Sequence, residues 1–124
     1  MNLRLLMLIL TSVACSAFAQ ILLRTGMAQP LMAEALMGRD ILTIAFRIAL
    51  NPWVIGGLGL YFLGAIFWLF VLSQVEASTA YPFVGIGFVL TFMLGVTLLG
   101  ENVTLLKVFG TLLVAAGVFV LAMT

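Results

Sequence analysis

The sequence predicts an all-α membrane protein with four transmembrane helices and an interfacial amphipathic helix between the first and second. Hydrophobic residues make up 65% of the 124 residues and charged residues only 7%, whereas soluble domains carry about 25% charged residues. The mean hydropathy of +1.37 agrees with this composition. The apolar residues fall into four runs, each near the roughly 20 residues that a helix needs to cross a bilayer. Residues 1–124 are therefore expected to form a single transmembrane domain.

The first apolar run, Leu5–Leu23, has three interpretations. Its small residues at Ala17–Ala19 resemble a signal-peptidase site, and the small residues before Cys15 weakly resemble a lipobox. The apolar part of a signal peptide, however, has about 7–15 residues, and this run continues without a break as far as Arg24. We therefore expect a retained transmembrane helix over about residues 3–24.

Three further runs are long enough to span the membrane, over about residues 52–74, 80–99 and 103–123. The last is interrupted only by Lys107 near its start. Aromatic residues near the ends of the runs are typical of anchors at the membrane interface, and Trp53, Trp68 and Tyr81 are assigned this ordinary role.

The connection between the first two runs holds most of the charged residues. On a helix, Arg39, Thr43 and Arg47 recur every four residues and share one face, while apolar side chains cover much of the remainder. This pattern is typical of a helix that lies in the membrane interface with its arginines among the headgroups. We expect one such helix over about residues 31–50.

Basic residues indicate the orientation in the membrane. The side that carries the first and third loops has four of them, and the side that carries the termini and second loop has only Arg4. The four are Arg24, Arg39, Arg47 and Lys107. By the positive-inside rule, the long first loop is expected in the cytoplasm and both termini in the periplasm.

Composition argues against several function classes. A net charge of +1 predicts no nucleic-acid partner, because phosphate binding needs a basic patch or stripe. With one cysteine there is no intramolecular disulfide, and without histidine there is no expected zinc site or Ser–His dyad. We therefore expect that the protein is not an enzyme and that it binds no cofactor and no metal.

Polar side chains form a stripe on the first helix. Ser12, Ser16 and Gln20 lie four residues apart, and Arg24 follows one turn later at the interface. The stripe either lines a cavity or supplies hydrogen bonds between helices, and spacing alone favours the second interpretation. The four acidic residues all lie in predicted loops or at helix ends. No carboxylate is therefore expected inside the membrane.

Glycines are found in the second and third predicted helices, where they are expected to have different roles. Gly85 and Gly87, near the start of the third helix, weaken it locally and predict a hinge, although close packing against a neighbour is the alternative. The glycines of the second helix are expected only to allow close packing. They are Gly56, Gly57, Gly59 and Gly64.

Ordered motifs in the second half of the chain resemble a known family. They are Leu72-Ser-x-x-x-Ala-Ser-x-Ala-Tyr-Pro-x-x-Gly-x-Gly87, then Gly100-Glu101, then Gly110-x-Leu-x-x-x-x-Gly117. The set is similar to the four-helix small multidrug resistance type transporters of the drug/metabolite transporter superfamily. The resemblance covers nearly the whole chain except the insertion over about residues 32–50.

The first helix separates two branches of that superfamily. The drug-exporting branch carries a membrane glutamate in this helix, and the matching position falls near Ser16. By contrast, Ser16-x-x-x-Gln20-x-x-x-Arg24 is similar to the first helix of the subunits that flip aminoarabinose-phosphoundecaprenol. This resemblance implies a non-enzymatic subunit in the bacterial inner membrane that flips an undecaprenyl-phosphate-linked sugar. The alternatives are an exporter of cationic or other small molecules and a helper subunit of a larger membrane enzyme.

The lipid-linked sugar would need hydrogen bonds for its hydroxyls and a cation for its phosphate. The candidate substrate-binding residues are Ser16, Gln20, Arg24, Arg47, Tyr81, Glu101 and Lys107. For Arg47 and Lys107, headgroup anchoring is the favoured alternative. Glu101 is expected to cap the fourth helix, with pairing to Lys107 or contact with an amino sugar as alternatives.

Partners are expected because four short helices enclose little volume. Membrane lipids surround the chain, and Gly110 and Gly117 on the fourth helix would permit close contact with a second chain. Four-helix units of the superfamily often pair in opposite orientations. The charge bias predicts one orientation for this chain, which favours a heterodimer with a related subunit over a homodimer.

Overall fold

The computed structural model describes residues 3–38 and 40–123, and its regular elements in these ranges are all helical. Four of its helical segments are long and apolar enough to cross a membrane, as predicted. They are α1 (Leu3–Met27), α4 (Pro52–Leu72), the combined segment Ala77–Leu98 and α7 (Leu105–Ala122).

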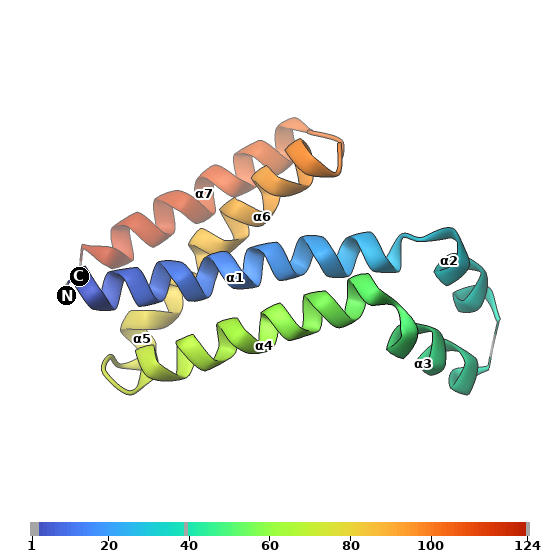
Figure 1. Cartoon of the computed structure of the whole chain (residues 1–124). Coiled ribbons are helices and arrows are strands. Elements are labelled where there is room, and N and C mark those ends of the chain that lie inside the picture. The colour runs from blue at the N-terminus through green and yellow to red at the C-terminus, as the bar shows by residue number, and fades with distance from the viewer. Residues whose placement is uncertain (1–2, 39, 124) are drawn as a thin grey trace.

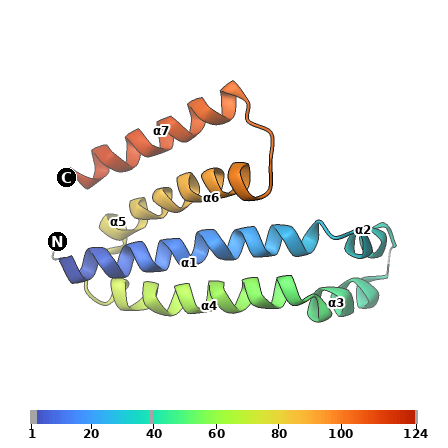
Figure 2. The same ribbon diagram turned by 45° about the horizontal axis from the view of Figure 1, so that its top comes forward.

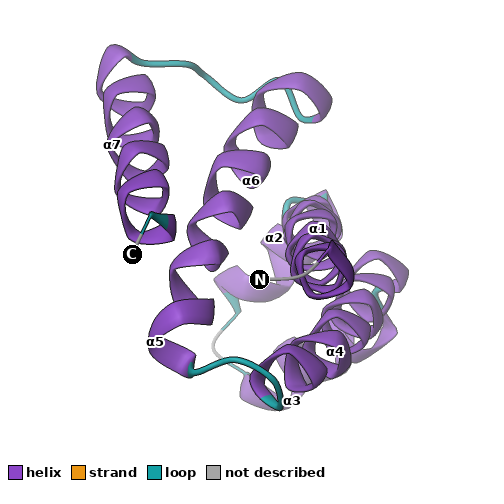
Figure 3. Ribbon diagram, turned by 90° about the vertical axis from the view of Figure 1, so that its left-hand side faces the viewer, coloured by secondary structure: helices purple, strands orange, loops and turns teal. Residues whose placement is uncertain are grey.

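The four segments lie side by side in the order α4, α1, α6 and α7 (Figures 1 and 3). α1 packs mainly on α4 and also on α6, and α7 packs on α6. The start of α1 and the end of α7 lie at one end of the molecule, whereas the first and third loops lie at the other (Figure 2). The prediction that the first and third loops lie at the same end of the molecule is therefore confirmed. Which end faces the cytoplasm stays a prediction.

Two glycines of α4 allow its close approach to α1. A Cβ atom at Gly57 would lie 3.1 Å from the carbonyl oxygen of Ala19, and one at Gly64 would lie 3.2 Å from that of Ser12. Larger side chains would therefore push the helices apart. The other two glycines of α4, Gly56 and Gly59, make no such contact within the described chain, because a Cβ atom there would meet nothing within 4 Å. A packing role for them stays a prediction.

The third membrane segment changes its helical form near its start. It runs through α5 (Ala77–Ala80), the 3-10 turn η1 (Tyr81–Phe83) and α6 (Val84–Leu98). Pro82 lacks the N–H that an α-helix would donate to the carbonyl of Ser78, which accounts for the tighter turn at this point. Helix therefore begins three residues before the predicted start at residue 80.

The predicted hinge glycines both lie at close helix contacts. A side chain at Gly85 would clash with Val118 of α7, and a Cβ atom at Gly87 would lie 3.2 Å from Cγ1 of Val13 on α1. Both glycines lie in regular helix after the 3-10 turn. Packing therefore accounts for their position, and a hinge at these residues stays a prediction.

The first loop contains two helices where one was predicted over about residues 31–50. They are α2 (Pro30–Met37) and α3 (Ile41–Leu50). The Asp40 carboxylate starts the second helix by accepting a hydrogen bond of 3.1 Å from the backbone N–H of Leu42. Such capping satisfies an N–H group that has no partner inside the helix. The prediction of a single long helix was therefore wrong, although short helices do occupy this loop.

A capping residue also joins α4 to the end of α1. The Asn51 side-chain oxygen accepts a hydrogen bond of 3.0 Å from the Trp53 N–H, and its amide nitrogen donates one of 2.8 Å to the Gly26 carbonyl. Asn51 therefore fixes the point where the first loop enters the second span.

Replacing Asn51 with alanine is expected to lower the free energy of unfolding by about 1–2 kcal/mol, because both the cap and the bond to Gly26 are lost. Asn51→Ser keeps a capping oxygen and loses only the amide donor, so a smaller loss is expected. Denaturation of the purified protein in detergent, followed by circular dichroism, measures both values. Equal losses in the two variants would contradict a stabilising role for the cap.

Candidate functional site

A cavity of about 260 Å³ lies between α1, α4 and the segment formed by η1 and α6. We call it the central cavity. Its polar and aromatic lining residues are Ser12, Ser16, Gln20, Tyr61, Trp68, Tyr81, Phe88 and Thr91. None of its lining residues, all within the described part of the chain, carries a formal charge at neutral pH. The cavity is thus polar in places but electrically neutral.

Helical spacing brings these side chains together. Ser12, Ser16 and Gln20 are four residues apart on α1, and Tyr61 and Trp68 are seven apart on α4. Residues at these intervals share one helix face. Tyr61 of α4 and Tyr81 of η1 both line the cavity and are both exposed.

The polar stripe on α1 has two roles. Ser12 is buried, and its hydroxyl donates a hydrogen bond of 2.7 Å to the Gly64 carbonyl of α4. Ser16 and Gln20 line the cavity and have no side-chain hydrogen bond to any described residue. The role in hydrogen bonding between helices, which the spacing favoured, thus applies to Ser12. The Ser16 hydroxyl and the Gln20 amide are free to bind a ligand.

Exchanging each serine for alanine separates these roles. Ser12→Ala should lower the free energy of unfolding by about 0.6–2 kcal/mol, the usual contribution of a hydrogen bond between membrane helices. Ser16→Ala removes no described hydrogen bond, so its unfolding should change far less. Denaturation of both variants in the same detergent provides the comparison. A larger loss for Ser16→Ala than for Ser12→Ala would show that Ser16, and not Ser12, stabilises the contact between the helices.

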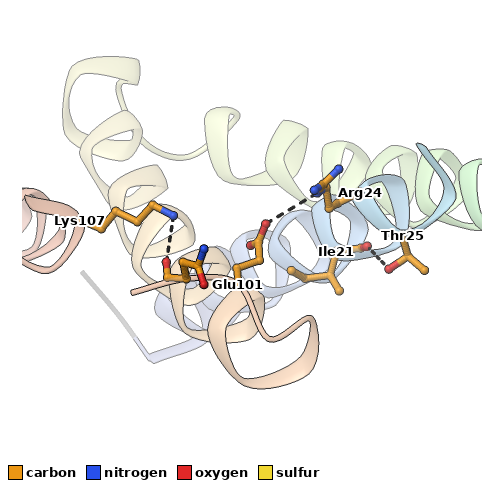
Figure 4. A network of polar contacts seen from close by, with 6 residues as sticks. Ile21, Arg24, Thr25, Glu101 and Lys107 are labelled. Atoms are coloured by element: carbon orange, nitrogen blue, oxygen red, sulfur yellow. Dashed lines mark hydrogen bonds and ion pairs between the residues drawn. The ribbon is translucent and has the colours of Figure 1, made fainter. Parts of the chain in front are cut away.

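Arg24 continues the stripe beyond the cavity. It lies one turn after Gln20, or about 6 Å along the helix axis, and does not line the cavity. Its Nε atom lies 3.7 Å from Oε2 of Glu101 in the connection between α6 and α7 (Figure 4). Both side chains are largely exposed. An exposed pair of this kind contributes only about 0–1 kcal/mol, so either partner can be released readily.

The backbone places Glu101 for this contact. Gly100 has a positive φ of 65°, which reverses the chain after α6. The N–H of Glu101 then donates a hydrogen bond of 3.1 Å to the carbonyl of Gly95. A side chain at Gly95 would clash with the carboxylate of Glu101. Gly95 therefore provides the space in which this carboxylate lies.

The expectation that Glu101 caps the fourth helix is wrong. Thr104 is the capping residue, because its hydroxyl accepts a hydrogen bond of 3.1 Å from the N–H of Lys107. The Lys107 ammonium group donates one of 3.0 Å to the Asn102 carbonyl, as Figure 4 shows, and does not pair with Glu101. α7 therefore begins at Leu105, four residues after Glu101.

The predicted site residues therefore fall into separate groups. Three of them line the central cavity: Ser16, Gln20 and Tyr81. Arg24 and Glu101 form a pair beyond it, and Lys107 contacts its own loop. Arg47 lines a second cavity, of about 800 Å³, formed by α2, α3 and the start of α4. We call this second space the end cavity.

Sequence reasoning missed four polar or aromatic residues of the central cavity: Tyr61, Trp68, Phe88 and Thr91. Trp68, assigned to the interface, is half-buried and packs against the core. The seven-residue spacing of Tyr61 and Trp68 was the available signal, since it places both aromatic side chains on one helix face.

No protein-family model and no solved structure matches the chain. Among curated proteins, the probable 4-amino-4-deoxy-L-arabinose-phosphoundecaprenol flippase subunit ArnF of Serratia proteamaculans is 35% identical over 115 residues, which cover 89% of this chain and 85% of the relative. The probable ArnE subunit of the same kind of flippase from Pseudomonas aeruginosa is 35% identical over 81% of this chain and 89% of its own length. The multidrug resistance protein EbrB of Bacillus atrophaeus is 45% identical over 57% of this chain and 62% of its own length.

Proposed function

Because this chain belongs to the small multidrug resistance-like family of drug/metabolite transporters, together with the ArnE and ArnF flippase subunits, we propose that it flips a polyprenyl-phosphate-linked sugar. It is a multi-pass inner-membrane protein with four apolar spans. Its relatives are flippase subunits and multidrug resistance proteins rather than enzymes. In this proposal the sugar crosses the membrane through the central cavity.

The neutral polar cavity between three of the apolar helices is the observation that carries the proposal. Ser16 lies near the middle of α1, whose 25 residues extend for about 37 Å. A sugar head has many hydroxyls that need hydrogen bonds in hydrocarbon. Ser16, Gln20 and Thr91 offer these bonds, and the aromatic rings provide apolar walls. The cavity volume of about 260 Å³ suits a head group, while the polyprenyl chain stays in the lipid.

Arg24 is the proposed phosphate contact. A guanidinium can bind two phosphate oxygens at once, and Arg24 stands one turn from Gln20. Glu101 then acts as a resting counter-ion that the phosphate replaces. This exchange keeps the arginine paired before and after the lipid binds.

Two charge-removing variants test this exchange. Arg24→Gln should weaken the binding of undecaprenyl phosphate about 10- to 100-fold, the effect expected for loss of a charge-assisted hydrogen bond. Glu101→Gln removes the competitor and should leave binding unchanged or tighter. Native mass spectrometry of the purified full chain, titrated with the lipid, measures both affinities. Equal weakening in the two variants would contradict the exchange.

A second chain is part of the proposal, because the ArnE and ArnF relatives are named as subunits. α7 has no buried residue, and a Cβ atom at Gly110 or Gly117 would meet nothing within 4 Å. This face is therefore available to a partner. The bias of basic residues favours one orientation in the membrane and so a heterodimer with a related four-helix subunit, with a homodimer as the alternative. Bending at Gly85 and Gly87 would change access to the cavity.

The match to the multidrug resistance protein EbrB favours an alternative, a small multidrug resistance-type exporter of cationic or other small molecules. Exchange of a cation for protons needs a group that binds each in turn, and no carboxylate lines the central cavity. Addition of a lipophilic cation such as tetraphenylphosphonium to the purified protein distinguishes the two. Proton release would support the exporter, and its absence together with lipid binding supports the flippase. If neither proton release nor lipid binding is observed, the protein would instead be a helper subunit.

Reconstitution tests the transport step itself. Proteoliposomes containing the full chain, alone or with a related four-helix subunit from the same genome, receive a fluorescent polyprenyl-phosphate sugar. We expect the dye to redistribute between leaflets faster than in empty liposomes, as measured by a membrane-impermeant quencher. Redistribution at the rate of empty liposomes in both preparations would contradict the proposed function.

A further inference from the structure

The end cavity combines apolar walls with one cation. Leu31, Met32, Phe46 and Trp53 contribute apolar surface, and Arg47 is its only charged lining residue within the described part of the chain. Its volume of about 800 Å³ lies within the range of about 300–1,000 Å³ found for small-ligand sites. An occupant that matches these walls is both amphiphilic and anionic.

The end cavity is separate from the central cavity. Between them, α1 and α4 are in close contact, because a Cβ atom at Gly26 would lie 3.0 Å from the backbone nitrogen of Val54. Gly57 makes the next close contact along the same seam. A molecule in the end cavity therefore lies outside the proposed transport path.

The charge of Arg47 is unpaired among the described residues. The neighbouring acid, Asp40, accepts hydrogen bonds from the Leu42 N–H and from the Thr43 hydroxyl, the latter at 2.8 Å. The Asn51 side chain is likewise engaged, by the start of α4 and by Gly26. The arginine is thus the lining group left to meet an anion from outside the protein.

The position of the end cavity matches the membrane boundary. It lies where α4 begins at Pro52, beside Trp53, a residue type that favours the headgroup region. α3 has no buried residue, and the side chains of Leu42 and Phe46 are 79% and 66% exposed. At this depth a lipid can place its acyl chains against the apolar side chains and its headgroup phosphate against the arginine.

We propose that the end cavity binds one anionic phospholipid of the surrounding bilayer, with its phosphate at Arg47 and an acyl chain along Phe46 and Trp53. A free phosphate ion would leave the apolar walls uncovered. A lipophilic cation would meet the like charge of Arg47. The bound lipid holds α2 and α3 at the membrane surface and is not transported. The proposal therefore does not depend on the proposed function.

Native mass spectrometry with defined lipids tests this site. The full chain in detergent is titrated with phosphatidylglycerol or with phosphatidylcholine of the same acyl chains. We expect tighter binding of phosphatidylglycerol, and a loss of at least about five-fold in Arg47→Gln, the effect of removing one basic residue near an anionic surface. Arg4→Gln, at the opposite end of α1, is the matched control and should bind as the unchanged protein does.

A second variant tests the apolar wall without changing the charge. Phe46→Ser should weaken both lipids, whereas Thr11→Val, on an exposed part of α1 that lines neither cavity, should weaken neither. Equal binding of the two lipids, or no effect of Arg47→Gln, would overturn the proposal. Displacement of phosphatidylglycerol by inorganic phosphate would reassign the site to a free anion. Displacement by undecaprenyl phosphate that needs Arg47 would reassign it to the transported lipid. A dimer that excludes phosphatidylglycerol would reassign it to a second copy of the chain.

Discussion

Replacing Gln20 with leucine should slow translocation of a polyprenyl-phosphate-linked sugar by about 10- to 100-fold. The amide lines the central cavity and has no described hydrogen-bond partner in the protein. Its loss leaves a sugar hydroxyl without a partner away from water, at a cost of about 1–3 kcal/mol. The quencher assay in proteoliposomes measures the rate.

Thr11→Val is the matched control for this variant. Thr11 is exposed on the same helix, and its hydroxyl donates only to the carbonyl of Met7. It does not line the central cavity, so its replacement should leave the translocation rate unchanged. If Thr11→Val and Gln20→Leu slow translocation equally, the effect belongs to α1 as a whole and not to the cavity.

Replacing Gly57 with valine should give the largest loss of stability, about 1–3 kcal/mol, because the added side chain is forced into a packed contact. Its Cβ atom would lie 2.9 Å from the Leu23 side chain and 3.1 Å from the Ala19 carbonyl oxygen. Gly56→Val makes the same chemical change one residue earlier, where a Cβ atom meets nothing within 4 Å. Denaturation in detergent should separate the two variants clearly. Similar values would show that α1 and α4 do not pack as described, or that a partner chain covers Gly56.

The spans were predictable because crossing a bilayer demands length and apolarity, and both are visible in the sequence. The second span, predicted over 52–74, forms α4 from Pro52 to Leu72. The helices of the first loop were harder to predict, because the helical periodicity of the sequence continues across the point where Asp40 starts a new helix. Periodicity alone does not show where a side chain caps a new helix.

The central cavity was predictable only on its α1 side. Ser16 and Gln20 stand out against an apolar helix, so their common face is visible in the sequence. On α4 nearly every residue is apolar, and the sequence does not show which face turns inward. Tyr61 and Trp68 were missed for this reason. The contact of Glu101 with Arg24 was missed because it depends on the turn at Gly100 and the space beside Gly95.

The central claim is that the neutral cavity recognises the sugar of a lipid-linked sugar. Native mass spectrometry of the full chain, with undecaprenyl phosphate competing against the same lipid bearing a sugar, tests it most directly. We predict that the sugar-bearing lipid binds more tightly and that Gln20→Leu removes this preference while retaining the affinity for the bare lipid phosphate. Equal affinity for the two lipids in the unchanged protein would contradict the claim.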